Sequence, residues 1–203
     1  MMDPSKIGGM TMTEAQQKIL DAVSRFSRAA MAQNDPAHDS AHVERVVRLT
    51  QNLSARCGAD AYRAELLAWL HDLNDDKLAS DLGTASIEGF LREIGAERSD
   101  IDFVLQGIPY ISYRKYPKLT PDIPLEIRLV QDADRLDAMG AIGIARTFAY
   151  GGARGRSLEE SLAHFDEKLL RLYDLLSTDA ARELAGQRRD LLRQFYDQFK
   201  EEM

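Results

Sequence analysis

The sequence predicts an all-α protein that folds as a single domain. Apolar residues recur at spacings of three and four along most of the chain, which is the period of an amphipathic helix. No segment shows the sustained apolar–polar alternation of a strand. The length of 203 residues and the hydrophobic content of 44% suit one domain with a full core. We expect residues 1–11 to be a flexible lead-in and residues 12–203 to form the helical bundle.

Glycine and proline divide the N-terminal half into predicted helices. The Asp35-Pro36 pair separates the first helix from the second, Gly58 ends the second helix, and Gly95 closes the fourth. The helices are expected at 14–28, from 38 or 39 through 53, at 61–72, 85–94 and 99–106. In the C-terminal half, residues 123–139 and 141–150 are expected to form helices that join with a bend at Gly140. Two long helices, 158–176 and 179–200, complete the chain.

Two connecting segments have features of a binding site. Residues 108–122 are long for a link between helices and are rich in tyrosine and basic residues. That composition suits a lid over a base and a phosphate about as well as it suits an ordinary surface loop. Residues 151–156, GGARGR, could bring backbone N–H groups to a phosphate, but a helix C-cap and hinge is the favoured interpretation. Arg154 remains a candidate contact in that segment.

The most informative stretch is LLAWLHDLNDDK, residues 66–77, in which an apolar helical segment ends in adjacent His71 and Asp72. Burying polar side chains at the end of such a segment costs free energy unless a partner satisfies them. Imidazole and carboxylate together are good ligands for a divalent cation. Adjacent helical residues point about 100° apart. Both can therefore reach one ion only at the helix end, and the ion needs further ligands from elsewhere in the chain.

The chain offers few such ligands. It has four histidines, and His42 follows His38 by four residues, on the same face of a predicted helix. An acidic cluster, Asp132, Asp134 and Asp137, lies in a later predicted helix. Because Asp132 and Asp134 point about 200° apart on a helix, we expect one ion to take only one of them.

Four segments in order resemble the HD-domain superfamily of metal-dependent phosphohydrolases: HDSAHVERV, LLAWLHDLNDDK, VQDADRLDAMGAIGIAR and HFDEKLLRLYDLL. They look more narrowly like a bacterial branch of stand-alone HD hydrolases, and the resemblance runs from about Ala15 to the C-terminus. It implies an HD-type helical bundle. The family's motif of an Asp followed by Arg-Leu matches Asp134, and Asp132 is the fallback ligand. Asp137 is expected to support the metal ligands from behind, without binding the ion itself.

The resemblance also implies a single divalent ion. Relatives with two metals need further histidines between the His-Asp pair and the last Asp, and this chain has none there. The ion is left open among Mn, Ni, Fe, Co, Mg and Zn, because such a ligand set accepts several metals. The implied ligands are His42, His71, Asp72 and Asp134.

The residues that follow the His-Asp pair are candidates for proton transfer and phosphate binding. Asp75 stands where HD nucleotidases have a Glu that resembles a base, and Asp76 is its rival. Lys77 offers a point charge for a phosphate. The candidate substrate contacts are His38, Arg45, Tyr113, Arg135, Arg146, His164 and Lys168.

The resemblance to HD hydrolases implies a phosphohydrolase of a small phosphorylated metabolite. Within the resembling branch, the first expectation is cleavage of a nucleoside triphosphate to monophosphate and pyrophosphate. The alternatives are a nucleoside 5′-monophosphate phosphomonoesterase and a non-catalytic nucleotide-binding sensor. The net charge of -7 argues against a nucleic-acid polymer as partner. The single Cys57, with no signal-peptide pattern and no membrane-spanning run, predicts a cytoplasmic protein without membrane contact; a homodimer is left open.

Overall fold

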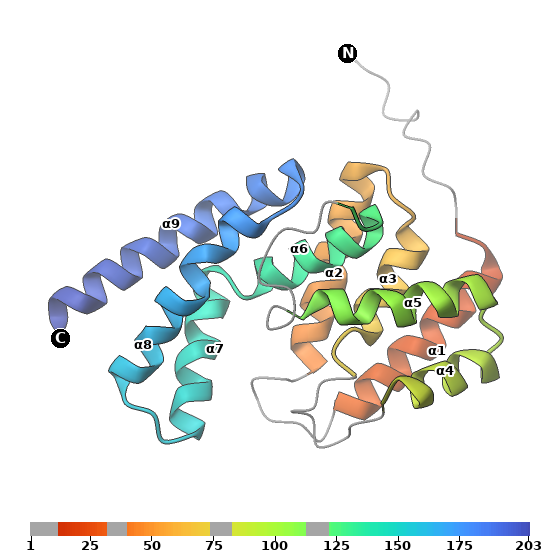
Figure 1. The fold of residues 1–203 in the computed structure, drawn as a ribbon, viewed down its shortest axis with the longest axis horizontal. Coiled ribbons are helices and arrows are strands. Elements are labelled where there is room, and N and C mark those ends of the chain that lie inside the picture. Colours follow the sequence, from red (N-terminus) through yellow and green to blue (C-terminus); the bar gives the residue numbers. More distant parts are fainter. Residues whose placement is uncertain (1–11, 32–39, 74–82, 113–121) are drawn as a thin grey trace, which may run out of the picture.

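The computed structural model describes residues 12–31, 40–73, 83–112 and 122–203, and within these ranges every regular element is a helix (Figure 1). The predicted all-α fold is therefore confirmed. No helix in these ranges is long and apolar enough to cross a membrane. The helices are α1 (Glu14–Met31), α2 (Ser40–Cys57), α3 (Ala61–Leu70), α4 (Gly83–Glu93), α5 (Arg98–Ile111), α6 (Leu125–Asp137), α7 (Gly140–Ala153), α8 (Leu158–Glu167), the 3₁₀ helix η2 (Leu169–Leu175) and α9 (Asp179–Glu202).

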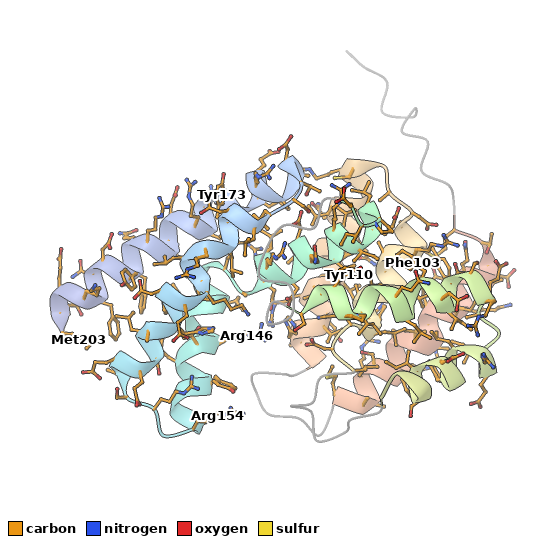
Figure 2. The ribbon with its side chains drawn as sticks, in the orientation of Figure 1. Phe103, Tyr110, Arg146, Arg154, Tyr173 and Met203 are labelled. Atoms are coloured by element: carbon orange, nitrogen blue, oxygen red, sulfur yellow. The ribbon has the colours of Figure 1, made fainter. Side chains whose placement is uncertain are left out.

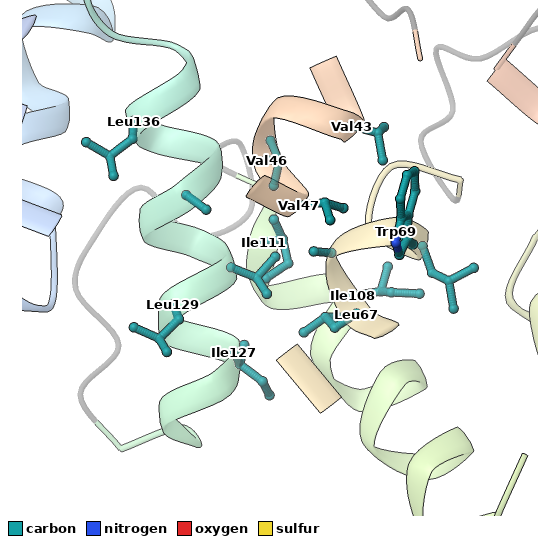
Figure 3. Packing of buried hydrophobic residues seen from close by; sticks show 14 of the residues in the cluster. Val43, Val46, Val47, Leu67, Trp69, Ile108, Ile111, Ile127, Leu129 and Leu136 are labelled. Carbon is teal, nitrogen blue, oxygen red and sulfur yellow. The ribbon is translucent and has the colours of Figure 1, made fainter. Parts of the chain in front are cut away.

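Helix α3 lies at the centre of the N-terminal part and contacts α1, α2, α5 and α6. Its apolar residues are buried around the whole circumference, so it has no solvent-exposed face along most of its length. Figure 3 shows Leu67 of α3 among Ile108 of α5 and Val46 and Val47 of α2. A Cβ on Gly107 would come within 2.9 Å of Leu67, so glycine permits this close approach of α5 to α3. The packing fixes where α3 ends, and its last residue precedes His71.

The C-terminal helices α7, α8 and α9 form a second group, which α6 joins to the first (Figure 1). Helix α9 contacts both α6 and α7. Aromatic rings of three helices pack between them, with Phe148 of α7 next to Phe165 of α8 and Phe195 of α9. This aromatic cluster joins α7, α8 and α9 to one another.

The structure corrects the predicted end of α5. The helix continues past Gln106 to Ile111 and contains Pro109. Proline removes one backbone hydrogen bond and normally ends a helix. Burial of Ile108 and Ile111 against the core favours the extra turn, because each buried aliphatic side chain contributes about 1.5–3 kcal/mol. The predicted 108–122 loop therefore starts later, and most of it, including Tyr113, lies outside the described residues.

Two breaks in the C-terminal half also differ from the predictions. The expected 158–176 helix ends at Glu167, and Lys168 (φ -135°, ψ -62°) leads into η2. Three residues per turn place Leu169 directly over Leu172, and both are buried. The expected bend at Gly140 is a complete break between α6 and α7, where Gly140 adopts φ +71°. The glycine positions at the ends of α2 and α4 were predicted correctly.

Candidate metal centre

The C-terminal end of α3 directs His71 into the protein. Asp60 caps the helix N-terminus by accepting a hydrogen bond from the backbone N–H of Arg63. His71 is the C-cap residue, and Leu73, fully buried, closes the following turn by donating its N–H to the Leu70 carbonyl at 3.2 Å. The backbone therefore turns back toward the core at the point where the His-Asp pair occurs.

The imidazole of His71 has one satisfied and one unsatisfied nitrogen. Its Nδ1 lies 2.7 Å from the Ala68 carbonyl oxygen, which can only accept, so Nδ1 carries the proton. Its Nε2 is then the nitrogen available to a ligand. This atom is buried and has no hydrogen-bond partner among the described residues; an oxygen of Asp72 lies 3.4 Å away. A buried polar atom without a partner costs free energy, and a metal cation shared with the carboxylate would satisfy it.

His42 of α2 is oriented in the same way by a different group. Its Nδ1 lies 2.7 Å from Asp137 Oδ2, so this nitrogen donates. Its Nε2 faces two further carboxylates, at 3.3 Å from Asp72 Oδ2 and 3.4 Å from Asp134 Oδ1. Two imidazole nitrogens and two carboxylates thus converge from α2, from the end of α3 and from α6.

This convergence has the dimensions of a metal site. One ligand atom each from His42, His71 and Asp134 lies within 4.8 Å of the others, and both histidines are buried. Asp72 directs one oxygen toward each imidazole. The Nε2 of His71 is the observation that tests the fit, because a divalent cation is a partner for it that no described side chain supplies. The residues present therefore fit a divalent metal ion.

The pKa of His42 also indicates that this site favours a positive charge. Burial alone would lower the pKa of His42, but hydrogen bonds with Asp137 and Asp72 and the charges of Asp72 and Asp134 raise it to about 9. Burial alone would raise the pKa of Asp137, yet its hydrogen bonds with His42 and Arg45 hold it well below the usual range. Asp137 is therefore ionised behind an imidazole that favours a cation on its other nitrogen.

Asp137 also gathers two arginines that were predicted to contact substrate. Arg45 donates through Nε at 2.6 Å and Nη2 at 3.1 Å, and Arg146 donates through Nη1 at 2.7 Å. The Arg45 and Arg146 side chains are 23% and 25% exposed, whereas that of Asp137 is 2% exposed. Both arginines thus lie at the rim of the metal centre. Sequence reasoning missed their shared carboxylate, although His42–Arg45 and Asp134–Asp137 have the same three-residue spacing on two helices that pack together.

The opposite face of α6 serves the fold. Asp132, the fallback ligand, accepts hydrogen bonds from the backbone and hydroxyl groups of Ser177 and Thr178 at 2.7–3.1 Å. Arg135 is 3% exposed and donates to the Leu175 carbonyl at 2.6 Å. In the described structure Arg135 thus binds η2, and its predicted contact with substrate remains a prediction. Both residues hold the junction of η2 and α9.

The other predicted residues fall into two groups. His164 lies on α8 with Nδ1 3.9 Å from Glu167 Oε2, and Lys168 caps that helix by donating its N–H to the His164 carbonyl. The predicted contacts of these two side chains with substrate remain predictions. The candidate base Asp75, its rival Asp76, Lys77, His38 and Tyr113 lie outside the described residues.

An all-α bundle with a histidine–carboxylate centre at the meeting point of three helices defines the class of this protein. No protein-family model matches the chain. The curated protein YpgQ of Bacillus subtilis (strain 168), described as uncharacterized, is 36% identical over 193 residues, which are 92% of this chain and 94% of YpgQ. A crystal structure of an HD-superfamily hydrolase from Bacillus thuringiensis is 36% identical, with a TM-score of 0.75, over 92% of this chain and 97% of that one.

The crystal structure of Bacillus subtilis YpgQ in complex with ADP has a TM-score of 0.81 and 34% identity, and the match covers 93% of this chain and 97% of that chain. Identity at this level over nearly the whole length shows common family membership. The chain belongs to the HD-domain superfamily of metal-dependent phosphohydrolases.

Proposed function

We propose that this enzyme hydrolyses nucleotides at one divalent metal ion, and that a nucleoside triphosphate is cleaved to the monophosphate and pyrophosphate. The observation that carries the proposal is the pair of oriented imidazoles, each with its Nδ1 held by an acceptor and its Nε2 directed at carboxylates in a buried site. The nucleotide class is supported by a relative of 34% identity whose crystal structure contains ADP. ADP has an aromatic base and a phosphate chain, both of which a substrate of this kind would share.

The ligands we assign are His42, His71, Asp72 and Asp134. A divalent ion held by these residues would lower the pKa of a bound water and neutralise charge on the phosphoryl group. The Ala68 carbonyl and Asp137 each accept the Nδ1 proton of one imidazole, so Nε2 is the nitrogen that would bind the ion. One ion is assigned, because the sequence has no histidine between Asp72 and Asp134 that could complete a second site.

The remaining roles fall to residues around the ligands. Asp75 or Asp76 would accept the proton of the attacking water, and Lys77 would contact a phosphate oxygen. Arg45 and Arg146 lie at the rim, and a guanidinium can bind phosphate in a bidentate manner. In the described conformation both arginines bind Asp137, so a phosphate would share them with that carboxylate.

A release screen tests the proposal directly. The purified protein is incubated with ribo- and deoxynucleoside mono- and triphosphates and with Mn, Mg, Ni, Co or no added metal, and both phosphate and pyrophosphate are measured. Pyrophosphate release from triphosphates is the expected result. Orthophosphate release from monophosphates would replace the proposal with the phosphomonoesterase. No release from a protein that has bound metal would favour a non-nucleotide substrate or the sensor.

A variant separates catalysis from folding. Asp72→Ala should abolish turnover while circular dichroism shows unchanged helix content, because Asp72 is partly exposed and does not belong to the hydrophobic core. Asp174→Ala, which removes an exposed carboxylate on η2, is the matched control and should retain full activity. Unchanged activity and metal content in Asp72→Ala would refute the assigned site.

A further inference from the structure

We infer that the cationic ledge formed by Arg154 and Arg156 at the end of α7 binds the pyrophosphate arm of the substrate. This inference rests on the proposed function and specifies how the same site recognises a triphosphate. The nucleoside arm would then lie on another side of the metal centre.

The ledge is connected to the metal centre through one face of α7. Arg146, Tyr150 and Arg154 follow one another at intervals of four residues, so they lie along the same side of the helix. Arg146 begins this row at the metal centre, where its Nη1 lies 2.7 Å from Asp137 Oδ2. Arg154 ends the row about 12 Å further along the helix axis, at a rise of about 1.5 Å per residue. Figure 2 labels both arginines on α7, with Arg154 at its far end.

Tyr150 holds the two arginines of the ledge in place. The guanidinium carbon of Arg154 lies 3.6 Å from the centre of the Tyr150 ring, and that of Arg156 lies 5.4 Å from it. The ring is half-buried, whereas both arginines are exposed. A cation over a tyrosine face gains about 0.5–1 kcal/mol at such a site and loses rotamer freedom. The guanidinium groups are therefore partly ordered before any anion arrives.

The positive charge of Arg156 also reaches the adjoining helix α8. Burial lowers the pKa of His164 on that helix, and the positive charges of Lys168 and Arg156 lower it further, whereas Glu167 raises it.

The chemistry of the ledge matches a pyrophosphate arm better than a nucleoside. A pyrophosphate group carries several negative charges in a short length, and guanidinium groups bind phosphate oxygens by charge-assisted hydrogen bonds. The aromatic ring that contacts the ledge among the described residues, Tyr150, already has a guanidinium over one face. The two arginines also lie near the C-terminus of α7, where cations stabilise a helix. If helix stabilisation were their only role, substitution of the arginines would change the stability of the protein and leave substrate binding unchanged.

Two substrates that share a nucleoside test the inference. One is thymidine 5′-triphosphate, or whichever triphosphate the release screen ranks first, and the other is the p-nitrophenyl ester of the matching monophosphate. The ester is cleaved at the same phosphorus but has no pyrophosphate. Arg154→Gln and Arg156→Gln are assayed singly and together, with Arg193→Gln as the control, because Arg193 is an exposed arginine on α9.

We expect the KM for the triphosphate to rise about tenfold in each single variant with little change in kcat, since a charged hydrogen bond is lost equally from ground and transition states. The KM for the ester should stay within about twofold of the wild-type value, and inhibition by tripolyphosphate should weaken in parallel with the triphosphate KM. Arg193→Gln should change none of these quantities.

Each other result is decisive. An equal rise in KM for the ester would assign the ledge to the nucleoside arm and overturn the inference. Unchanged KM for both substrates, with wild-type protein active on triphosphates, would overturn the inference and leave the proposed function intact. Inactivity of the wild-type protein on every triphosphate would overturn the proposed function, and the inference with it.

Discussion

Asp137 lies directly behind His42, with its Oδ2 2.7 Å from the His42 Nδ1, and both side chains are buried. The carboxylate selects the imidazole tautomer, and it also receives Arg45 and Arg146 from two different helices. A single side chain of α6 therefore connects the predicted metal ligand on α2 with the start of the basic row on α7. Substitution of Asp137 should therefore affect the orientation of His42 and both arginines.

Asp137→Asn should weaken metal binding by about 10- to 100-fold, because the amide keeps the shape but loses the charge that orients His42. Isothermal titration with Mn²⁺ or Ni²⁺ measures the affinity. The Tm in the presence of chelator reports separately on the cost of leaving two arginines without their carboxylate. Asp174→Asn, on the exposed side of η2, should leave metal affinity unchanged. Wild-type affinity in Asp137→Asn would show that Asp137 does not position His42.

Metal should stabilise the wild-type protein and fail to stabilise a ligand variant. Free metal at 100 times its Kd adds about 2.7 kcal/mol to the free energy of unfolding, which is roughly 5–10 °C in Tm for a domain of this size. His71→Ala should lose this shift, since its buried Nε2 has no hydrogen-bond partner in the part of the chain that the structure describes. His164→Ala, on α8, should keep it. Equal shifts in the two variants would contradict the assignment of His71 as a ligand.

Asp132→Ala should destabilise the protein without affecting the metal. The carboxylate receives hydrogen bonds from the N–H and hydroxyl groups of Ser177 and Thr178, which precede α9. Loss of buried hydrogen bonds to a charged group costs about 1.5–3 kcal/mol, measurable by urea denaturation. Metal content by elemental analysis should stay at the wild-type level. Lost metal with unchanged stability would restore Asp132 as a ligand in place of Asp134.

Two adjacent glycines near the end of α7 should respond in opposite ways to alanine. A Cβ on Gly151 would lie 2.1 Å from Ser161 Oγ on α8, whereas a Cβ on Gly152 would meet no atom within 4 Å. Gly151→Ala should destabilise by about 1–3 kcal/mol through overpacking, and Gly152→Ala should stabilise by up to about 1 kcal/mol through helix propensity. Thermal or urea unfolding measures both.

The Ser161 side chain provides a check on that explanation. Ser161→Ala removes the hydroxyl that a Cβ on Gly151 would meet. The double variant Gly151→Ala/Ser161→Ala should therefore be more stable than the sum of the two single changes predicts. Additive free energies would mean that the cost of Gly151→Ala arises elsewhere in the α7–α8 contact.

The sequence by itself determined the helical class and several boundaries. Spacings of three and four residues are a local property of a helix, and Gly58 and Gly95 end helices because both adopt a positive φ that other residues avoid. The His71-Asp72 pair was recognisable because polar groups that end an apolar segment need partners, and the ordered motifs of the resemblance supplied the rest of the candidate set.

Only the tertiary structure decided which of these residues meet. Asp132 and Asp134 are two residues apart in one acidic cluster, yet α6 presents Asp132 to the start of α9 and Asp134 to His42. The continuation of α5 through Pro109 was likewise decided by burial of Ile108 and Ile111. The physical reason is the same in both cases. A helix's period is set by neighbours in sequence, whereas the partner of each face is set by packing between segments far apart in the chain.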